Sequence, residues 1–418
     1  MASRWSRGRR RDHTPRPSLR NTFSALSIRP YRQWFISQVL SASGTMTQSV
    51  ALSWLVLRLT GSGVDLGLVT TCTFAPMLLG GPWAGALVDR ANRRRLLIVT
   101  QCLYIVLSLT LALVTATGVT RLWMVLVVAL ASGCVGAPDA AARQVYAIDL
   151  VGLEFLTSAV SLNEVVLNAS RVVGPALGGV LLATAGVTAC CLANAASFIP
   201  PLIVLYQHRR LALPERPVSP HRDHLMMGLR YAWQNRTIRL VLLLAAASGM
   251  LFNMGVPLPL LATRTFHLGP AGYGLMMSVF GVGGIVGGVC AAAGHRAPTR
   301  AMVVVLAAVT AGTVLATALA RNVTEVYLGL VVTGWASIWF IARANALVQF
   351  ESPPQLRGRV MAVWSMALPG LMPVTSPLVG YVAGALGARE GFGLSGAALA
   401  VLALAGVRGS RPRRDASA

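Results

Sequence analysis

The stretch Gly85-Ala-Leu-Val-Asp89-Arg90-Ala-Asn-Arg93-Arg94-Arg95 is a short charged segment between two long apolar runs. The runs cover roughly residues 65–87 and 95–118. A helix of about 20 apolar residues crosses the hydrocarbon core of a bilayer, and only helices or closed barrels satisfy their backbone hydrogen bonds in lipid. Because both runs are continuously apolar, they predict two membrane-spanning helices joined by a basic loop.

The same alternation of apolar runs and short charged loops continues along most of the 418 residues. Charged residues make up only 12% of the chain, whereas a typical soluble protein has about 25%. We therefore predict an all-α membrane protein with twelve transmembrane helices in two six-helix halves. The predicted spans are 34–57, 65–87, 95–118, 122–142, 157–183, 186–206, 239–263, 270–293, 301–320, 324–344, 357–384 and 387–407.

The longest connection between apolar runs lies in the middle of the chain, which separates the two predicted halves. Within it, Leu225, Leu229 and Trp233 recur at helical spacing among arginines, which favours an amphipathic helix on an anionic inner leaflet over a plain solvated linker. The predicted regions are a basic tail (1–33), an N-terminal half (34–206), a central loop (207–238), a C-terminal half (239–408) and a second tail (409–418).

The basic residues are distributed unevenly between the two ends of the predicted helices. All 36 are arginines, and the formal net charge is +23. Both tails and one set of loops hold most of them; we call this end the Arg-rich end. The positive-inside rule makes it cytoplasmic, so we predict a multi-pass protein of the cell membrane with both termini inside. The charge lies in loops and forms no nucleic-acid-binding motif, so no nucleic-acid partner is predicted. The opposite, Arg-poor end holds only Arg58, Arg121, Arg264, Arg321 and Arg389.

Several charged residues fall inside predicted spans, where one charge costs roughly 2.5–3.5 kcal/mol on the insertion scale. Asp139 and Arg143 stand four residues apart on one helix, and Glu164 and Arg171 share the next span. This cost makes such residues functional candidates, with snorkelling to the interface as the alternative for those near helix ends. We predict Asp139 and Glu164 as candidates for proton coupling.

Further polar and aromatic side chains recur on single helix faces in three other spans. They either line a central cavity or form interhelical hydrogen bonds, and we favour the cavity. These candidates are Gln38, Ser41, Thr45, Gln48, Ser248, Asn253, Trp335, Trp339 and Arg343.

Several of these motifs resemble the major facilitator superfamily, whose loop between spans 2 and 3 carries a G-x-L-x-D-R-x-G-R-R pattern; Asn92 stands at its second glycine. Narrower matches are similar to the drug–proton antiporter group that includes enterobactin and macrolide exporters. The resemblance extends from about Arg29 to Arg408. The narrower matches are Asp139-Ala-Ala-Ala-Arg143-Gln144, Ala159-Val-Ser-Leu-Asn163, Arg171-Val-Val-Gly174-Pro175-Ala-Leu-Gly178-Gly179, Phe266-His-Leu-Gly-Pro-Ala-Gly-Tyr-Gly274 and Leu356-Arg357-Gly358-Arg359-Val360-Met361.

The resemblance implies two halves that rock around a cavity lined by helices 1, 4, 7 and 10. It also implies a cytoplasmic gate at the loop between spans 2 and 3, and an exporter-type motif in helix 5 that seals the halves on the outer side. The implied gating residues are Gly85, Asp89, Arg90, Arg93, Arg94 and Arg143, and the helix 5 motif is Arg171, Gly174, Pro175, Gly178 and Gly179.

We predict a secondary transporter that acts as a monomer and exports a small amphipathic compound, such as a drug, an antibiotic or a siderophore-like metabolite, in exchange for protons. An uptake permease of the same fold is the first alternative, and a membrane-embedded enzyme is the second. The six histidines lie in tails or loops, and no nucleotide-binding G-x-x-x-x-G-K-[ST] occurs. The six cysteines form no C-x-x-C pair. We therefore predict no enzymatic activity, no cofactor and no metal.

Overall fold

Helices make up all the regular structure that the computed structural model describes, which covers residues 23–152, 154–211, 224–293, 297–353, 356–367 and 370–408. Side chains are also outside the described residues at 81–86 and at Asp89, which lie within a helix. The elements of the N-terminal half are η1 (Ser24–Ser27), α2 (Arg29–Thr60), α3 (Gly63–Arg90), α4 (Arg93–Ala116), α5 (Leu122–Val151), α6 (Leu156–Ser197), α7 (Ile199–Gln207) and η2 (His208–Arg210).

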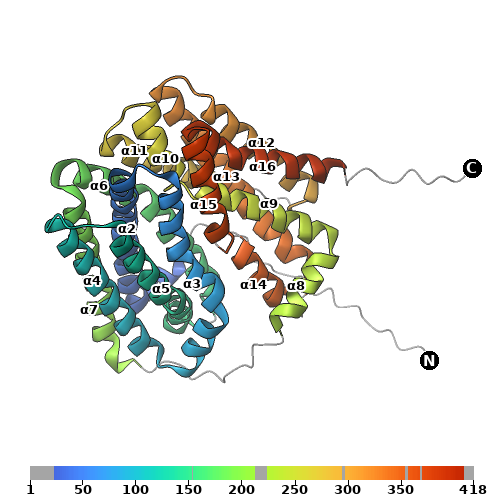
Figure 1. Cartoon of the computed structure of the whole chain (residues 1–418). Coiled ribbons are helices and arrows are strands. Elements are labelled where there is room, and N and C mark those ends of the chain that lie inside the picture. Colours follow the sequence, from blue (N-terminus) through green and yellow to red (C-terminus); the bar gives the residue numbers. More distant parts are fainter. Residues whose placement is uncertain are drawn as a thin grey trace, which may run out of the picture.

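The remaining elements are more numerous and mostly shorter, with α8 in the predicted central loop and the others in the C-terminal half, and Figure 1 shows them grouped beside the N-terminal helices. The prediction of an all-α fold is confirmed for the described residues. The elements are α8 (His224–Gln234), α9 (Arg236–Phe252), α10 (Pro257–Leu260), the π-helix η3 (Leu261–Thr265), α11 (Pro270–Ala293), α12 (Arg300–Ala318), α13 (Val323–Glu351), α14 (Arg357–Ala367), α15 (Met372–Ala385) and α16 (Ala388–Arg408).

By length and composition, eight helical stretches of the described chain can cross a membrane, and a ninth results if α8 and α9 count as one span bent by 103°. One of the eight, Ser158–Gln207, is 50 residues long. It contains Gly186 at φ 77° and ψ −174°, a conformation that glycine adopts at little cost. A total of twelve therefore requires that this stretch be divided at Gly186 and that α2 and the pair α14–α15 also span the bilayer.

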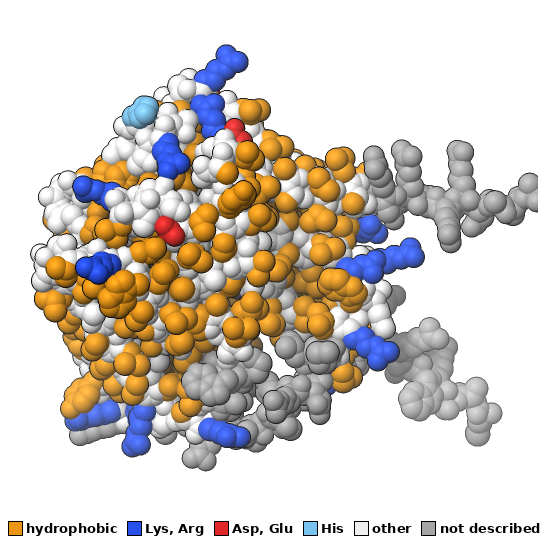
Figure 2. Space-filling view, viewed as in Figure 1, with side chains coloured by type: hydrophobic (Ala, Val, Ile, Leu, Met, Phe, Trp, Pro, Cys, Tyr) orange, Lys and Arg blue, Asp and Glu red, His pale blue; other side chains and the backbone are white. Residues whose placement is uncertain are grey.

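Apolar side chains cover much of the outer surface between arginines at the two ends, as Figure 2 shows for one face. Large exposed residues such as Leu79, Leu113 and Val374 belong to this apolar surface. Such an extensive apolar surface is rare in soluble monomers, and it is consistent with helices that face lipid.

The two halves meet mainly along two seams, α6 against α11 and α3 against α15. In the first seam Gly179 lies against Gly274, so closely that a Cβ atom on Gly274 would come 2.6 Å from the Gly179 Cα. In the second, Thr71 Oγ1 donates a hydrogen bond to the Pro373 carbonyl at 2.8 Å. These residues lie in the Arg-poor parts of their helices, so the contacts between the halves concentrate toward the Arg-poor end.

Candidate functional site

A buried carboxylate, Asp139 of α5, accepts three side-chain hydrogen bonds inside the N-terminal half. It is 4% exposed. Thr100 Oγ1 donates to it at 2.6 Å, Gln101 Nε2 at 2.9 Å and Arg143 Nε at 2.5 Å. The spacing of four residues had predicted the contact with Arg143, because such residues share one helix face. The structure adds the two α4 side chains, so the carboxylate is both charge-paired and hydrogen-bonded.

Arg143 extends this cluster from α5 to α2. Its Nη1 donates to Gln38 Oε1 and its Nη2 donates to Gln101 Oε1 at 3.3 Å. Gln101 therefore binds the carboxylate through its NH₂ group and the guanidinium through its oxygen. A buried charge pair is tolerated when further hydrogen bonds satisfy its remaining atoms. We call Gln38, Thr100, Gln101, Asp139 and Arg143 the polar cluster.

The polar residues predicted to share one face of α2 have different neighbours in the structure. Gln38 belongs to the polar cluster, whereas Gln48 accepts a hydrogen bond from Asn194 Nδ2 at 2.8 Å. Ser41 is buried, and only Thr45 is exposed. Gln38 and Gln48 therefore connect α2 to other helices of its own half. Thr45 is the residue of this set whose side chain is exposed.

At the Arg-rich rim, two of the predicted gating arginines bind within the N-terminal half. Arg93 forms an ion pair with Asp149 at 3.0 Å, and Arg94 donates to the carbonyl of His208. Asn92 caps α4 by accepting from the Arg95 backbone N–H at 3.2 Å, which is a reason for asparagine at this position. Arg90 is exposed, whereas Gly85 and the side chain of Asp89 are among the positions whose surroundings are not described.

His208, which follows a span at the Arg-rich end, is only 5% exposed. Its Nδ1 is 3.0 Å from the Tyr146 hydroxyl and its Nε2 is 3.2 Å from Gln33 Oε1. Burial, and then the nearby charge of Arg94, lowers the pKa of His208 below its ordinary value. The imidazole is therefore neutral near pH 7, and it joins α2, α5 and the end of α7.

The glycines of the predicted helix 5 motif serve two different interfaces. Gly174 and Gly178 pack on α2, where Thr47 Oγ1 donates to the Gly174 carbonyl at 2.9 Å. Gly179 faces α11 of the other half, and the Pro175 carbonyl also lies against Gly274. Small residues permit this close approach of helices, so the motif is part of the seam between the halves.

Arg171 and Glu164 lie on the same α6 helix, closer to the Arg-rich end. Arg171 is half-buried, and its Cζ atom lies 5.5 Å from the centroid of the Phe252 ring at the end of α9. Glu164 is exposed, two helical turns earlier. Arg171 therefore reaches from the N-terminal half onto the C-terminal half.

The candidates in the C-terminal half lie on α9, at its C-terminal end, and on α13. Ser248 is buried and donates to the Ala245 carbonyl of its own helix at 2.7 Å, whereas Asn253 Nδ2 donates to Ser376 Oγ at 2.5 Å. The rings of Trp335 and Trp339 on α13 are 5.2 Å apart and half-buried. Arg343, one turn further, is 7% exposed.

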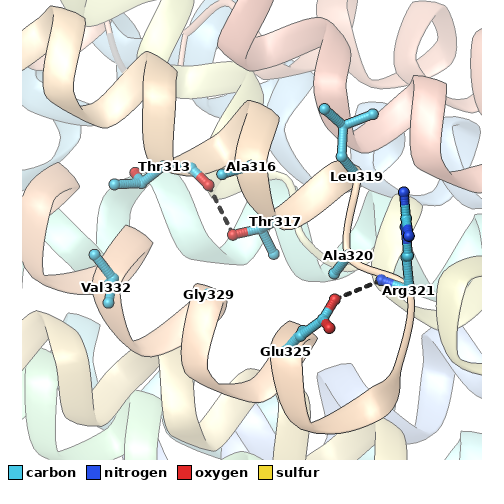
Figure 3. A pocket seen from close by; sticks show the side chains of 9 residues that line it. All are labelled: Thr313, Ala316, Thr317, Leu319, Ala320, Arg321, Glu325, Gly329 and Val332. Atoms are coloured by element: carbon cyan, nitrogen blue, oxygen red, sulfur yellow. Dashed lines mark hydrogen bonds between the residues drawn. The ribbon is translucent and has the colours of Figure 1, made fainter.

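A pocket of about 540 Å³ lies between α12 and α13 at the Arg-poor end (Figure 3). Thr317 Oγ1 donates to the Thr313 carbonyl on one wall at 2.7 Å, and Glu325 accepts from the Arg321 backbone N–H at 2.7 Å. The pocket contains none of the predicted site residues. Within the described part of the chain, no group of three or more His, Cys, Asp or Glu side chains is arranged to hold a metal ion.

Sequence comparison identifies the family. The family described as transmembrane secretion effector, a family of major facilitator transporters, matches residues 20–418. The chain belongs to this family. It is 26% identical to the staphyloferrin A transporter of Staphylococcus aureus, over 87% of this chain and 92% of that protein. It is 25% identical to the multidrug efflux pump Tap of Mycolicibacterium fortuitum over 84% and 88%, and 26% identical to the enterobactin exporter EntS of Citrobacter koseri over 82% of each.

Solved structures support the same fold. The nucleoside transporter NupG superposes with a TM-score of 0.71 at 14% identity, over 92% of this chain and all of that one. A bacterial homologue of the iron transporter ferroportin, in an inward-facing state, gives a TM-score of 0.69 at 18% identity over 92% and 99%. The protein is thus a multi-pass membrane transporter of the major facilitator superfamily with efflux proteins among its relatives, and it is not an enzyme.

Proposed function

We propose that the protein is a monomeric, proton-coupled exporter of small amphipathic compounds, with twelve spans and both termini in the cytoplasm. The exporter function rests on its relatives, since two of the three described above are named as an efflux pump and an exporter. The uptake alternative finds no comparable support. The orientation rests on the arginine asymmetry between the two ends, and the division into regions predicted from the sequence is kept.

Transport then proceeds by alternating access. Because the two seams bring the halves together toward the Arg-poor end, the conformation corresponds to an inward-facing state. In the opposite state the seams separate and the Arg-rich ends close. We propose that Asp89 and Arg90 of the loop motif then form the cytoplasmic gate with Arg143, as the resemblance to the superfamily implies.

Proton coupling follows from a competition for Arg143. In the inward-facing state its guanidinium lies on Asp139 and on Gln38. If Arg143 moves to the gate, Asp139 loses its cation while it remains buried. A buried carboxylate without a cation takes up a proton, because a charge in dry surroundings is costly. The three donors on Asp139 are the observation that carries this proposal, and the exposed Glu164 becomes the secondary candidate.

The test separates driven export from passive exchange in proteoliposomes that contain the purified protein. The probe is the first compound, from a panel of amphipathic anions, cations and neutral molecules, that the wild type moves against a pH gradient. We expect Asp139→Asn to abolish gradient-driven export while it retains exchange of probe across vesicles without a gradient. Glu351→Gln, which removes an exposed carboxylate at the end of α13, should retain both activities. Loss of both activities in Asp139→Asn, or of neither, would show that the residue is a structural ion-pair partner only.

A further inference from the structure

Arg171 carries a positive charge deep within a predicted membrane span. The apolar stretch begins at Ser158, so Arg171 lies about 20 Å along the helix at 1.5 Å per residue. This depth is too great for its side chain to reach the polar interface easily, and such a residue requires a partner. We therefore examined what surrounds its guanidinium.

The nearest described group is aromatic. The guanidinium carbon lies 5.5 Å from the centroid of Phe252, and the Phe252 ring packs edge-on against Phe280 at 6.0 Å. The backbone of Arg171 also lies against Gly281 of α11. The guanidinium therefore lies where the two halves meet, next to the Phe252 ring, which in turn packs on Phe280.

No described carboxylate pairs with this guanidinium. The two ion pairs among the described residues join Arg93 to Asp149 and Arg143 to Asp139. The nitrogens of Arg171 are not enclosed either, because the side chain is half-buried and none of them is a buried atom without a partner. Among the described residues, its guanidinium therefore has an aromatic neighbour and no hydrogen-bond acceptor.

Glu164 acts on Arg171 from a distance. The two residues are seven positions apart, so they share a helix face with a rise of about 10 Å between them. Glu164 is exposed, and it lies on the same helix. It lies closer to the Arg-rich end, and it leaves the guanidinium free for a ligand.

We infer that Arg171 binds the anionic group of the transported compound, a carboxylate or a similar planar oxyanion, while the apolar or aromatic part of that compound lies on Phe252 and Phe280. This inference rests on the proposed transport function and specifies its substrate class. A guanidinium presents two parallel donors that match a carboxylate, and such charge-assisted pairs are strong. The Phe252 ring holds the guanidinium by a cation–π contact. Phe252 and Phe280 together offer apolar surface to the rest of the ligand.

The experiment measures binding, so it does not depend on the direction or the coupling of transport. The full-length protein is placed in nanodiscs of zwitterionic phosphatidylcholine, and its affinity for naphthoate and for the uncharged, nearly isosteric naphthamide is determined by equilibrium dialysis. We expect the wild type to bind naphthoate about tenfold more tightly than naphthamide, which corresponds to one charge-assisted hydrogen-bonded contact.

Three variants define the site. Arg171→Gln should lose this preference by weakening naphthoate binding alone, and Arg171→Lys should retain part of it, since lysine keeps the charge without the planar fork. Glu164→Gln should strengthen naphthoate binding, because it removes a competing anion. Arg321→Gln, which removes an exposed arginine of the Arg-poor end, should behave as the wild type. Thermal unfolding of each variant shows whether it is folded.

The inference is overturned if the wild type does not prefer the acid, or if folded Arg171→Gln keeps the preference. It is also overturned if Glu164→Gln weakens naphthoate binding, because Arg171 would then serve only as the partner of Glu164. Loss of the preference when phosphatidylglycerol replaces part of the lipid, with Arg171→Gln unaffected, would identify a lipid phosphate as a competitor for the same site. A wild type that shows the preference but no driven transport would refute the proposed function and leave the anion site standing.

Discussion

The two halves of the transporter are stabilised by different kinds of interaction. The N-terminal half joins α2, α4 and α5 through the polar cluster around Asp139 and Arg143, and it adds the rim pair of Arg93 and Asp149. In the described C-terminal half no salt bridge occurs, and neutral side-chain hydrogen bonds such as Asn253 to Ser376 and Thr317 to Thr333 join its helices. Ion pairs thus distinguish the described part of the first half from that of the second.

The two halves also differ in where their helices are interrupted. In the C-terminal half α9 ends at Phe252 and is followed by the one-turn helix α10 and the π-helix η3. The main interruption within the N-terminal helices is the turn at Gly186. π-Turns and breaks often mark places where a helix deforms. We therefore predict that the N-terminal half, with its ion pairs, moves as the rigid half, and that the other half absorbs the bending when the seams open.

The largest effect should come from removing a charge partner in the rigid half. Asp139→Ala leaves the half-buried Arg143 without its carboxylate, and the loss of a partner from a buried pair costs about 3 kcal/mol at most here. Ser337→Ala removes a buried hydroxyl that bonds only to the Gly334 carbonyl, and it should cost no more than about 1 kcal/mol. Thermal unfolding of the purified variants in one detergent measures both. Equal losses would show that the halves do not differ in this respect.

An intermediate effect is expected where the halves meet at the Arg-poor end. Arg264 of η3 donates to the carbonyl of Gly61, at the C-terminal end of α2, and so links the two halves. Arg264→Gln removes a charge-assisted bond worth about 1.5 kcal/mol, which should raise the population of the opened seam roughly tenfold. Ser278 of α11 is 5% exposed and donates to the Val172 carbonyl across the seam. The rate at which Ser278→Cys is labelled in a cysteine-free background therefore reports how often the seam opens.

Arg389→Gln is the matched control for this experiment. The Arg389 guanidinium stacks on Phe266 within the C-terminal half, 5.7 Å from the ring centroid. Its loss should leave the labelling rate at position 278 unchanged. The link between the halves is refuted if the two arginine variants accelerate labelling alike.

The smallest effect is expected from pH at His208. Its pKa is lowered in the folded protein, so the unfolded chain binds the proton more readily. The stabilisation from the neutral imidazole is complete above the unfolded pKa of about 6.5, and it is lost as the pH falls toward the folded value. The melting temperature should therefore decrease slightly between pH 7.5 and 5.5, and His208→Gln should reduce that decrease. A decrease of the same size in the variant would exclude His208 as its source.

The sequence was most informative where one helix carries both partners. The spacing of Asp139 and Arg143 predicted their contact, and the arginine asymmetry distinguished the two ends. Thr100 and Gln101 were missed, although two adjacent polar residues inside an apolar run were a usable signal, because sequence alone does not show which helix faces which. Asp149 was missed for the same reason.

Several local features of the backbone and of single side chains were not predicted from the sequence. The break after Phe252 was not predicted, even though Pro257 and Pro259 follow it and proline disrupts helix hydrogen bonding. Asn92 seemed only a departure from the loop motif, and the structure reveals its capping bond to the Arg95 backbone N–H. His208 was assigned to a loop from hydropathy, which does not report that Gln33 and Tyr146 enclose it.

The order of residues in the polar cluster bears on how the protein is synthesised. Gln38, Thr100 and Gln101 all precede Asp139 in the chain, and Arg143 follows it by four positions. As the polypeptide leaves the ribosome from its N-terminus, every partner of this carboxylate has therefore been translated by the time α5 is complete. Domains generally fold as units, N-terminal first, during synthesis. We expect that the costly charges of α5 enter the bilayer already matched, with no contribution from the C-terminal half.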